Sequence, residues 1–114
     1  MKYSASIIWI HSKHNIFLTN SDETMRRDIN LTPAIIQFSE KNILMQFNWD
    51  DYGYSVSFRL IKENIYEGII ISQHEELGTA VLHLYQFQQK YLCRVEWHED
   101  SDEADCFIIT KEAL

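Results

Sequence analysis

The chain holds few of the residues that interrupt secondary structure or cross-link a fold: three glycines, one proline and two cysteines among 114 residues. So little glycine and proline excludes collagen-like repeats and argues against intrinsic disorder. Two cysteines are too few for the disulfide framework of a small secreted domain. We therefore expect Cys93 and Cys106 to be reduced, partly buried thiols that do not lie directly opposite one another.

Long apolar runs are also lacking. The run nearest the N-terminus, Ile7-Ile8-Trp9-Ile10, ends at His11. The apolar core of a signal peptide takes about 7 to 15 residues and a membrane-spanning helix about 20, so this run predicts neither. The expectation is a cytoplasmic protein without a membrane partner.

Basic residues are outnumbered, and the imbalance is local. The chain has 10 basic and 17 acidic residues, a net charge of −7. The window 96–105 holds six of the acids and no Lys or Arg, so the other residues carry a net charge of only −1. Such a segment repels phosphate, which disfavours nucleic-acid binding, and it attracts a basic protein partner.

Aromatic and β-branched residues are abundant, and many of them alternate with polar residues. The chain has 15 aromatic residues, and the stretch from Tyr54 to Leu60 alternates apolar and polar side chains as a half-buried strand does. Similar patterns predict strands at 5–11, 16–19, 34–38, 43–49, 54–60, 65–72, 79–87, 90–97 and 106–110. About eight or nine strands at this spacing indicate one all-β or β-rich domain over residues 1–114, an antiparallel meander closed as a barrel or packed as a sandwich.

The segments between the predicted strands differ in character. Residues 20–31 open with a capping-box pattern, Asn20 and Glu23, which predicts one short helix near 21–28, with an irregular loop as the alternative. Gly53 is expected to take a positive φ in a turn, and Gly68 to mark a bend or bulge. We expect a loop at 73–78, and another formed by the acidic segment.

The second half of the chain carries a family resemblance. It has a glycine inside a strand (Gly68), the alternating segment 80–84, Leu92, and the tripeptide Trp97-His98-Glu99 ahead of the last strand. In this order, residues 65–110 resemble the closing meander of calycin-like small β-barrels. The resemblance implies an interior pocket for a small apolar ligand but identifies no ligand-binding residue.

Catalytic and metal-binding patterns are weak. His11 and His14 have a metal-ligand spacing, but they flank a predicted turn and have no third ligand nearby. His98 lies among carboxylates that favour its charged form, yet the acidic segment lacks the spacing of a calcium loop. Cys93 and Cys106 lie between apolar neighbours, where thiols are usually inert. We therefore expect no enzyme activity, no metal and no cofactor.

Two functions compete. The first is a non-catalytic acidic protein-binding module, such as an immunity-type inhibitor that neutralises a basic toxin nuclease. Its contact residues are Glu96, Trp97, Glu99, Asp100, Asp102, Glu103 and Asp105. The alternative is a calycin-like barrel that binds a small apolar molecule in a cavity lined by Phe58, Leu82, Tyr91 and Val95.

Five aromatic residues could line a ligand pocket or a protein-binding face, but residues of this kind more often belong to the core, and we expect core here. The set is Trp9, Trp49, Trp97, Tyr52 and Tyr54. The sequence leaves the oligomeric state, the strand order and the choice between barrel and sandwich open.

Overall fold

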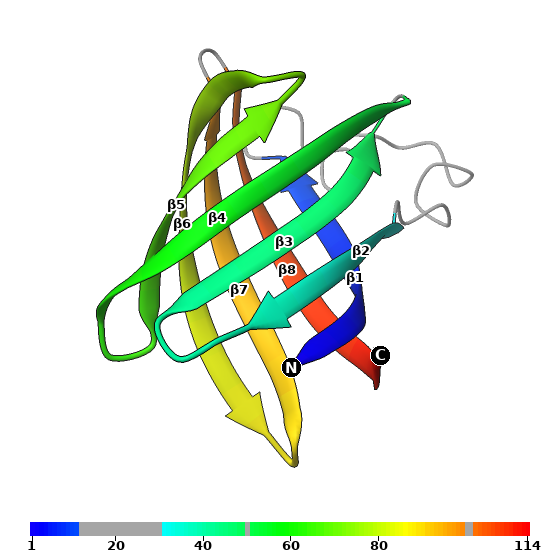
Figure 1. Cartoon of the computed structure of the whole chain (residues 1–114), viewed down its shortest axis with the longest axis vertical. Helices are drawn as coiled ribbons and strands as arrows, with labels where there is room; N and C mark the ends of the chain where they lie inside the picture. Colours follow the sequence, from blue (N-terminus) through cyan, green and yellow to red (C-terminus); the bar gives the residue numbers. More distant parts are fainter. Residues whose placement is uncertain (12–30, 50, 100–101) are drawn as a thin grey trace.

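The fold is a closed antiparallel barrel of eight strands (Figure 1). The computed structural model describes residues 1–11, 31–49, 51–99 and 102–114. Each strand pairs with the next along the chain, and the last pairs with the first. The strands are β1 (Lys2–His11), β2 (Leu31–Phe38), β3 (Asn42–Trp49), β4 (Tyr52–Lys62), β5 (Ile65–Ser72), β6 (Glu75–Phe87), β7 (Lys90–Glu99) and β8 (Asp102–Ala113).

The predicted antiparallel meander is confirmed. Of the two predicted arrangements, barrel and sandwich, the structure is the barrel. This is also the fold that the calycin-like resemblance implies. Closure gives every strand a neighbour on both sides along the body of the barrel, which removes most of the exposed edge at which sheets aggregate. The predicted strand at 16–19 and helix at 21–28 lie outside the described residues, and within those residues there is no helix. None of the described part of the chain therefore forms a helix able to cross a membrane.

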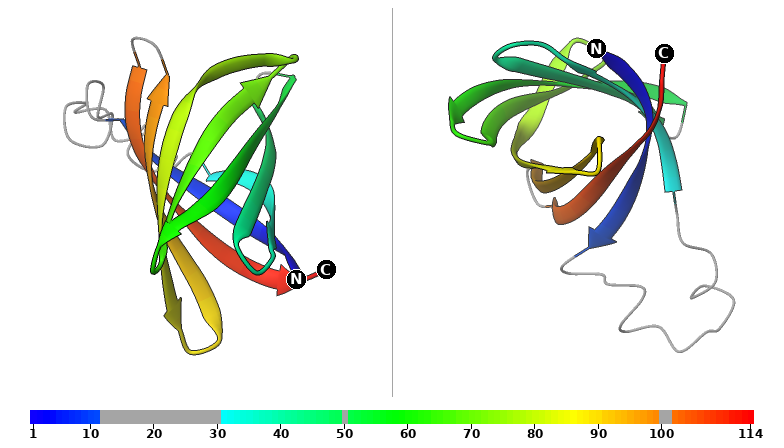
Figure 2. Two further views of the ribbon diagram at one scale, coloured as in Figure 1. Left: turned by 60° about the vertical axis from the view of Figure 1, so that its left-hand side comes forward. Right: turned by 90° about the horizontal axis from the view of Figure 1, so that it is seen from below.

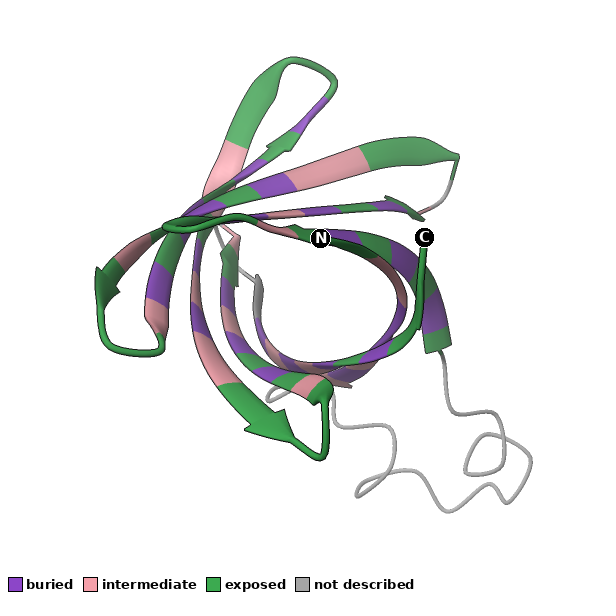
Figure 3. Ribbon diagram, turned by 60° about the horizontal axis from the view of Figure 1, so that its bottom comes forward, coloured by how far each residue is buried: buried purple, intermediate pink, exposed green. Residues whose placement is uncertain are grey.

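The middle of the barrel is filled by every second side chain along the strands. Buried and exposed residues alternate along the strands (Figure 3), as in β5, where every second residue from Tyr66 to Ser72 is buried. The interior positions meet in one apolar core. Its fully buried side chains are Ile7, Ile36, Ile43, Met45, Val56, Phe58, Ile70, Leu82, Cys93, Val95, Cys106 and Ile108. The middle of the barrel is therefore solid.

The two chain termini lie side by side at one end of the barrel (Figure 2). The N-terminal ammonium group of Met1 donates a hydrogen bond to the carbonyl oxygen of Phe38 at 2.8 Å. Behind it, the rings of Tyr3, Phe38 and Tyr91 pack together with centroids 4.5 to 5.8 Å apart. Aromatic rings therefore fill the interior at this end.

The strands extend further than predicted, and several turns are correspondingly shorter. The expected loop at 73–78 is only the pair Gln73-His74, because β6 begins at Glu75. The single proline, Pro33, lies in β2 opposite Ser6. It is tolerated there because the pairing of β2 with β3 begins one residue later, at Ala34, so its missing amide hydrogen breaks no bond of that ladder.

The positive φ predicted at Gly53 and the bulge considered at Gly68 were both wrong. No described glycine has a positive φ, and in the turn before Gly53 it is Asp51 that has one, at 66°. Gly68 is not at a bulge, because it pairs in regular register with Phe58 and Ala80. A Cβ at Gly68 would lie 2.6 Å from a ring carbon of Phe58, so the glycine makes room for that buried ring.

Strand β6 has apolar residues on both faces, such as Leu82 and Leu84 on one and Val81 and Tyr85 on the other. Every strand of a closed barrel has two neighbours, yet the end of β6 is not buried: Tyr85 is 52 % and Phe87 69 % exposed. The reason is visible in Figure 1, where the hairpin of β6 and β7 projects past the body of the barrel.

The turn of this hairpin gives a stability prediction. Gln88 and Gln89 both have positive φ, at 49° and 67°, which is the type I′ conformation that Asn-Gly adopts most readily. Replacing Gln88-Gln89 by Asn-Gly is expected to raise the free energy of unfolding by about 1 kcal/mol, measured by urea denaturation. The same replacement at the regular β4 residues Ser57 and Phe58 serves as control and should destabilise. An unchanged midpoint for the turn variant would contradict the assigned turn.

The cysteines are free and do not face each other, as predicted, but they are completely rather than partly buried. Cys93 pairs with Ile108, and Cys106 with Val95. Burial raises the pKa of the Cys93 thiol from 9.0 to about 12 and raises that of Cys106 further, with the neighbouring Asp105 charge contributing. Both thiols are therefore protonated and unreactive in the native state.

This burial has a consequence for stability at high pH. Below pH 9 both thiols are neutral in the folded and the unfolded chain. Above pH 9 only the unfolded chain releases their protons readily, so the free energy of unfolding is expected to fall as pH rises from 9 toward 12, by up to about 1.4 kcal/mol per pH unit for each thiol. Replacing both cysteines by alanine should flatten this slope in urea denaturation, and an identical slope would contradict the assignment.

Candidate functional site

The pleat of the sheet divides the acidic segment between two faces. Strand β7 continues to Glu99 and β8 begins at Asp102, so the predicted loop is mostly strand. Trp97 is buried in the barrel, and Glu99 lies two residues further along the same inner face. Glu96 pairs with Asp105 across the outer face. Asp100 lies outside the described residues, as do the side chains of Asp102 and Glu103.

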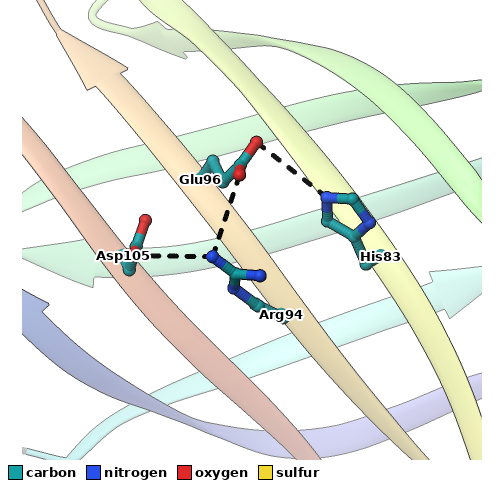
Figure 4. A network of polar contacts seen from close by, with 4 residues as sticks. All are labelled: His83, Arg94, Glu96 and Asp105. Carbon is teal, nitrogen blue, oxygen red and sulfur yellow. Dashed lines mark ion pairs between the residues drawn. The ribbon is translucent and has the colours of Figure 1, made fainter.

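On the outer face the acidic residues have basic neighbours (Figure 4). Nη2 of Arg94 lies 3.8 Å from Oε1 of Glu96 and 3.9 Å from Oδ2 of Asp105. Nε2 of His83 lies 3.9 Å from the other oxygen of Glu96. Exposed ion pairs of this kind contribute at most about 1 kcal/mol, but Arg94 offsets part of the negative charge. The predicted acidic surface is thus smaller than the composition of the segment indicates.

No metal site emerges among the described residues, where no group of three or more His, Cys, Asp or Glu side chains is placed to hold an ion. His98 is exposed on the outer face of β7, opposite Glu103 in the register. His14 lies outside the described residues, and so does the side chain of His11.

A cavity of about 140 Å³, partly open to solvent, lies at the end of the barrel remote from the termini. Five strands contribute to it: β1, β3, β4, β7 and β8. Its wall consists of five aromatic rings, one small side chain and one carboxylate. The lining residues are Trp9, Phe47, Trp49, Tyr54, Trp97, Glu99 and Ala104.

The aromatic rings of the wall contact one another, both edge to face and stacked. The rings of Trp9 and Trp97 are perpendicular with centroids 5.3 Å apart, and those of Trp9 and Trp49 meet at 70° and 5.9 Å. Phe47 stacks on Tyr54 at 5.2 Å with an interplanar angle of 9°. Edge-to-face and offset-stacked pairs of this kind stabilise each other by about 0.5 to 1.5 kcal/mol, so the wall is held in place by its own contacts.

Trp9 is also fixed by a buried hydrogen bond. Its indole Nε1 donates to the hydroxyl oxygen of Thr32 at 2.9 Å, and both residues are buried. The bond joins β1 to β2 and sets the orientation of the indole beside the cavity.

Replacing Thr32 by valine is expected to lower the free energy of unfolding by about 1 to 3 kcal/mol, because the buried indole N–H loses its acceptor while the shape is kept. Thermal unfolding measures the change, and Thr79→Val at an exposed position of β6 is the matched control. If the two variants unfold at the same temperature, the bond does not fix Trp9.

The aromatic set from the sequence is largely brought together here. Trp9, Trp49, Trp97 and Tyr54 all line the cavity, whereas Tyr52 is 51 % exposed and does not. Core and pocket are not exclusive alternatives here, because Trp9 and Trp97 belong to the buried core and also line the cavity.

The cavity residues predicted for the barrel alternative were wrong. Phe58, Leu82 and Val95 fill the solid middle of the barrel, and Tyr91 packs near the termini. The sequence prediction missed Phe47 and Ala104. Phe47 could have been predicted, because it alternates with Trp49 along β3 and so lies on the same face. Ala104 could not, because nothing in the sequence distinguishes it from other alanines.

A second, larger depression of about 440 Å³ lies where β3 and β5 end and β4 begins. It is open to solvent, and polar groups such as Gln46, Asn48 and Ser55 form much of its wall. It encloses a small molecule less well than the aromatic cavity does, so the aromatic cavity is the stronger candidate.

Comparisons with protein-family models, with curated proteins and with solved structures each found no match to this chain. Any role of the aromatic cavity must therefore be argued from its own side chains.

Proposed function

We propose that this protein is a non-catalytic binding protein that holds a small molecule in the aromatic cavity. The observation that carries the proposal is the contrast between the two parts of the interior. The middle of the barrel is completely filled, whereas a space of about 140 Å³ is kept between five aromatic rings at one end. Binding sites are typically apolar concavities with a few placed polar groups.

The size of the cavity limits the ligand. An apolar cavity of about 150 Å³ holds one benzene molecule, while pockets for drug-sized ligands measure about 300 to 1,000 Å³. The ligand is therefore a molecule of few non-hydrogen atoms, or one end of a larger molecule. The calycin-like resemblance of residues 65–110 agrees with an interior ligand, although the cavity lies at the end of the barrel rather than in its middle.

The proposal is tested by titrating the isotope-labelled protein with a panel of molecules of benzene size, neutral and charged, and recording amide and indole N–H resonances. A ligand in the cavity should shift the indole signals of Trp9, Trp49 and Trp97. Signals near Tyr3 and Tyr91, at the other end of the barrel, serve as the internal control. The absence of any saturable shift across the panel would contradict the proposal.

Binding of a basic protein through the acidic segment stays a second proposal. It is supported by the concentration of six excess negative charges in residues 96–105. Trp97 is only 5 % exposed, so a partner on the outer face would contact carboxylates without this indole. Replacing four carboxylates of the segment by amides should slow association with a basic partner and flatten its salt dependence. Unchanged association kinetics would contradict this second proposal.

A further inference from the structure

We infer that the end of the barrel that carries the β6–β7 hairpin docks on an anionic lipid membrane. Phe87 and Tyr85 enter the headgroup region, and the lysines of the same end face the lipid phosphates. Docking of this kind is independent of the aromatic cavity, which lies at the other end of the barrel.

The hairpin extends beyond the strands beside it. β6 pairs with β5 as far as His83, which lies opposite Ile65, and then continues through residues 84–87. At about 3.3 Å per residue, these four residues extend roughly 13 Å along the strand. The hairpin projects past the other turns of this end in both side views (Figures 1 and 2), so it would meet a flat surface first.

Apolar side chains form a continuous row on the outer face of the hairpin and the strand beside it. Phe87 is 69 % and Tyr85 52 % exposed. Tyr85 lies opposite Leu92, and Leu92 lies opposite Ile109, both of them also exposed. We call these four residues the hairpin patch. Single exposed apolar residues are ordinary, whereas contiguous ones indicate a surface that contacts something apolar.

The charges at this end are mainly positive. Five of the six lysines of the chain lie here, in turns or near strand ends, and all five are exposed: Lys2, Lys41, Lys62, Lys90 and Lys111. The same turns and strand ends hold three acids, Glu40, Glu63 and Glu112. Within the part of the chain that the structure describes, none of the five lysines makes an ion pair. They are therefore open to an external anion.

The negative charge of the protein lies away from the hairpin. At the cavity end, the described residues include the acids Asp51, Glu75 and Glu76 and no Lys or Arg. The barrel is 44 Å along its longest axis, whereas charges in physiological salt are screened over about 8 Å. The net charge of −7 thus orients the protein, with the hairpin toward an anionic surface, rather than preventing its approach.

A lipid surface fits both features of this end. Segments that bind at a membrane interface combine aromatic side chains, buried at the headgroup boundary, with Lys or Arg beside them. A nucleic-acid backbone would meet the lysines but leave the aliphatic Leu92 and Ile109 in water. The sequence-based expectation of no membrane partner came from the lack of a long apolar run, and a hairpin that enters only the headgroup region needs no such run.

The test measures co-sedimentation of the protein with vesicles of phosphatidylcholine alone and of phosphatidylcholine mixed with phosphatidylglycerol. Partition onto the anionic vesicles is expected to be at least about tenfold stronger and to weaken as salt is added. Lys90→Gln should weaken it about fivefold on anionic vesicles only. Equal partition onto the two kinds of vesicle would overturn the role of the lysines.

The contribution of the hairpin is tested with matched aromatic variants. Phe87→Ser should weaken partition at least about tenfold and Tyr85→Ser about three- to tenfold. Tyr52→Ser is the control, because Tyr52 is a tyrosine of the same exposure, 51 %, at the opposite end of the barrel. Its effect should stay within about twofold. Equal losses in Tyr85→Ser and Tyr52→Ser would overturn docking through the hairpin.

A protein partner is separated from a membrane by the same material. Absence of partition onto either kind of vesicle would overturn membrane docking. If sedimentation velocity then showed a dimer that Phe87→Ser dissociates, the hairpin patch would belong to an interface between two copies of the chain. A monomer that binds anionic vesicles and loses that binding in Phe87→Ser is the result expected here.

Discussion

Ala104→Leu is expected to abolish small-molecule binding, by at least about a hundredfold, while raising the free energy of unfolding by about 1 kcal/mol. Ala104 lies on β8 opposite Trp97 and is 6 % exposed. Its methyl group forms part of the cavity wall. A leucine there extends into the space between the aromatic rings, so it takes the place of the ligand and buries additional apolar surface.

This combination of effects is unusual, because enlarging a buried side chain in a filled core destabilises by about 1 to 3 kcal/mol. Binding is measured by calorimetry with the panel of benzene-sized molecules, and stability by urea denaturation. Ala113→Leu, at an exposed position of the same strand, adds the same group outside the cavity and should leave binding unchanged. Strong destabilisation of Ala104→Leu would mean that the space is not available to a side chain or a ligand.

Gly78→Ala is expected to lower the free energy of unfolding by about 3 kcal/mol, the upper end of the usual range for overpacking. Gly78 lies on β6 opposite Glu99. A Cβ at this position would collide with the carbonyl oxygen of His98 and lie 2.9 Å from its carbonyl carbon and 3.0 Å from Cα of Glu99. These are backbone atoms and cannot rotate away, so β6 and β7 would have to separate where Glu99 is positioned.

Gly53→Ala provides the matched control for this change. A Cβ there meets only Oδ1 of Asn48, at an ordinary contact distance of 3.6 Å, and the residue has no positive φ. Its effect on the free energy of unfolding should stay within about 0.5 kcal/mol. Equal stability of the two variants in urea would contradict the close approach of β6 to the end of β7.

The architecture was predictable because the pattern that encodes it is local. In the stretch from Tyr54 to Leu60 the side chains alternate residue by residue, and such alternation identifies a strand without knowledge of its neighbours. For the acidic segment this reasoning gave the wrong answer, a loop in place of strand. Its composition is typical of a solvated loop, but Trp97 continues the buried face of β7, and pairing with β6 keeps the segment in the sheet as far as Glu99.

The site was less predictable because it depends on contacts between distant strands. Trp9, Trp49 and Trp97 are about 40 or more residues apart, and only barrel closure brings their rings together. The same holds for Gly68, whose role is set by the ring of Phe58 on the neighbouring strand. Alternation predicts which face a residue occupies, but not which part of that face stays unfilled.

A ligand site between the three tryptophans is tested most directly by intermolecular nuclear Overhauser effects. The labelled protein would be measured separately with a neutral probe and with a charged probe from the panel of benzene-sized molecules. The structure predicts contacts from the protons of at least one probe to the indole protons of Trp9, Trp49 and Trp97. Contacts only to Tyr3, Phe38 and Tyr91 at the opposite end of the barrel, or no contacts from either probe, would contradict it.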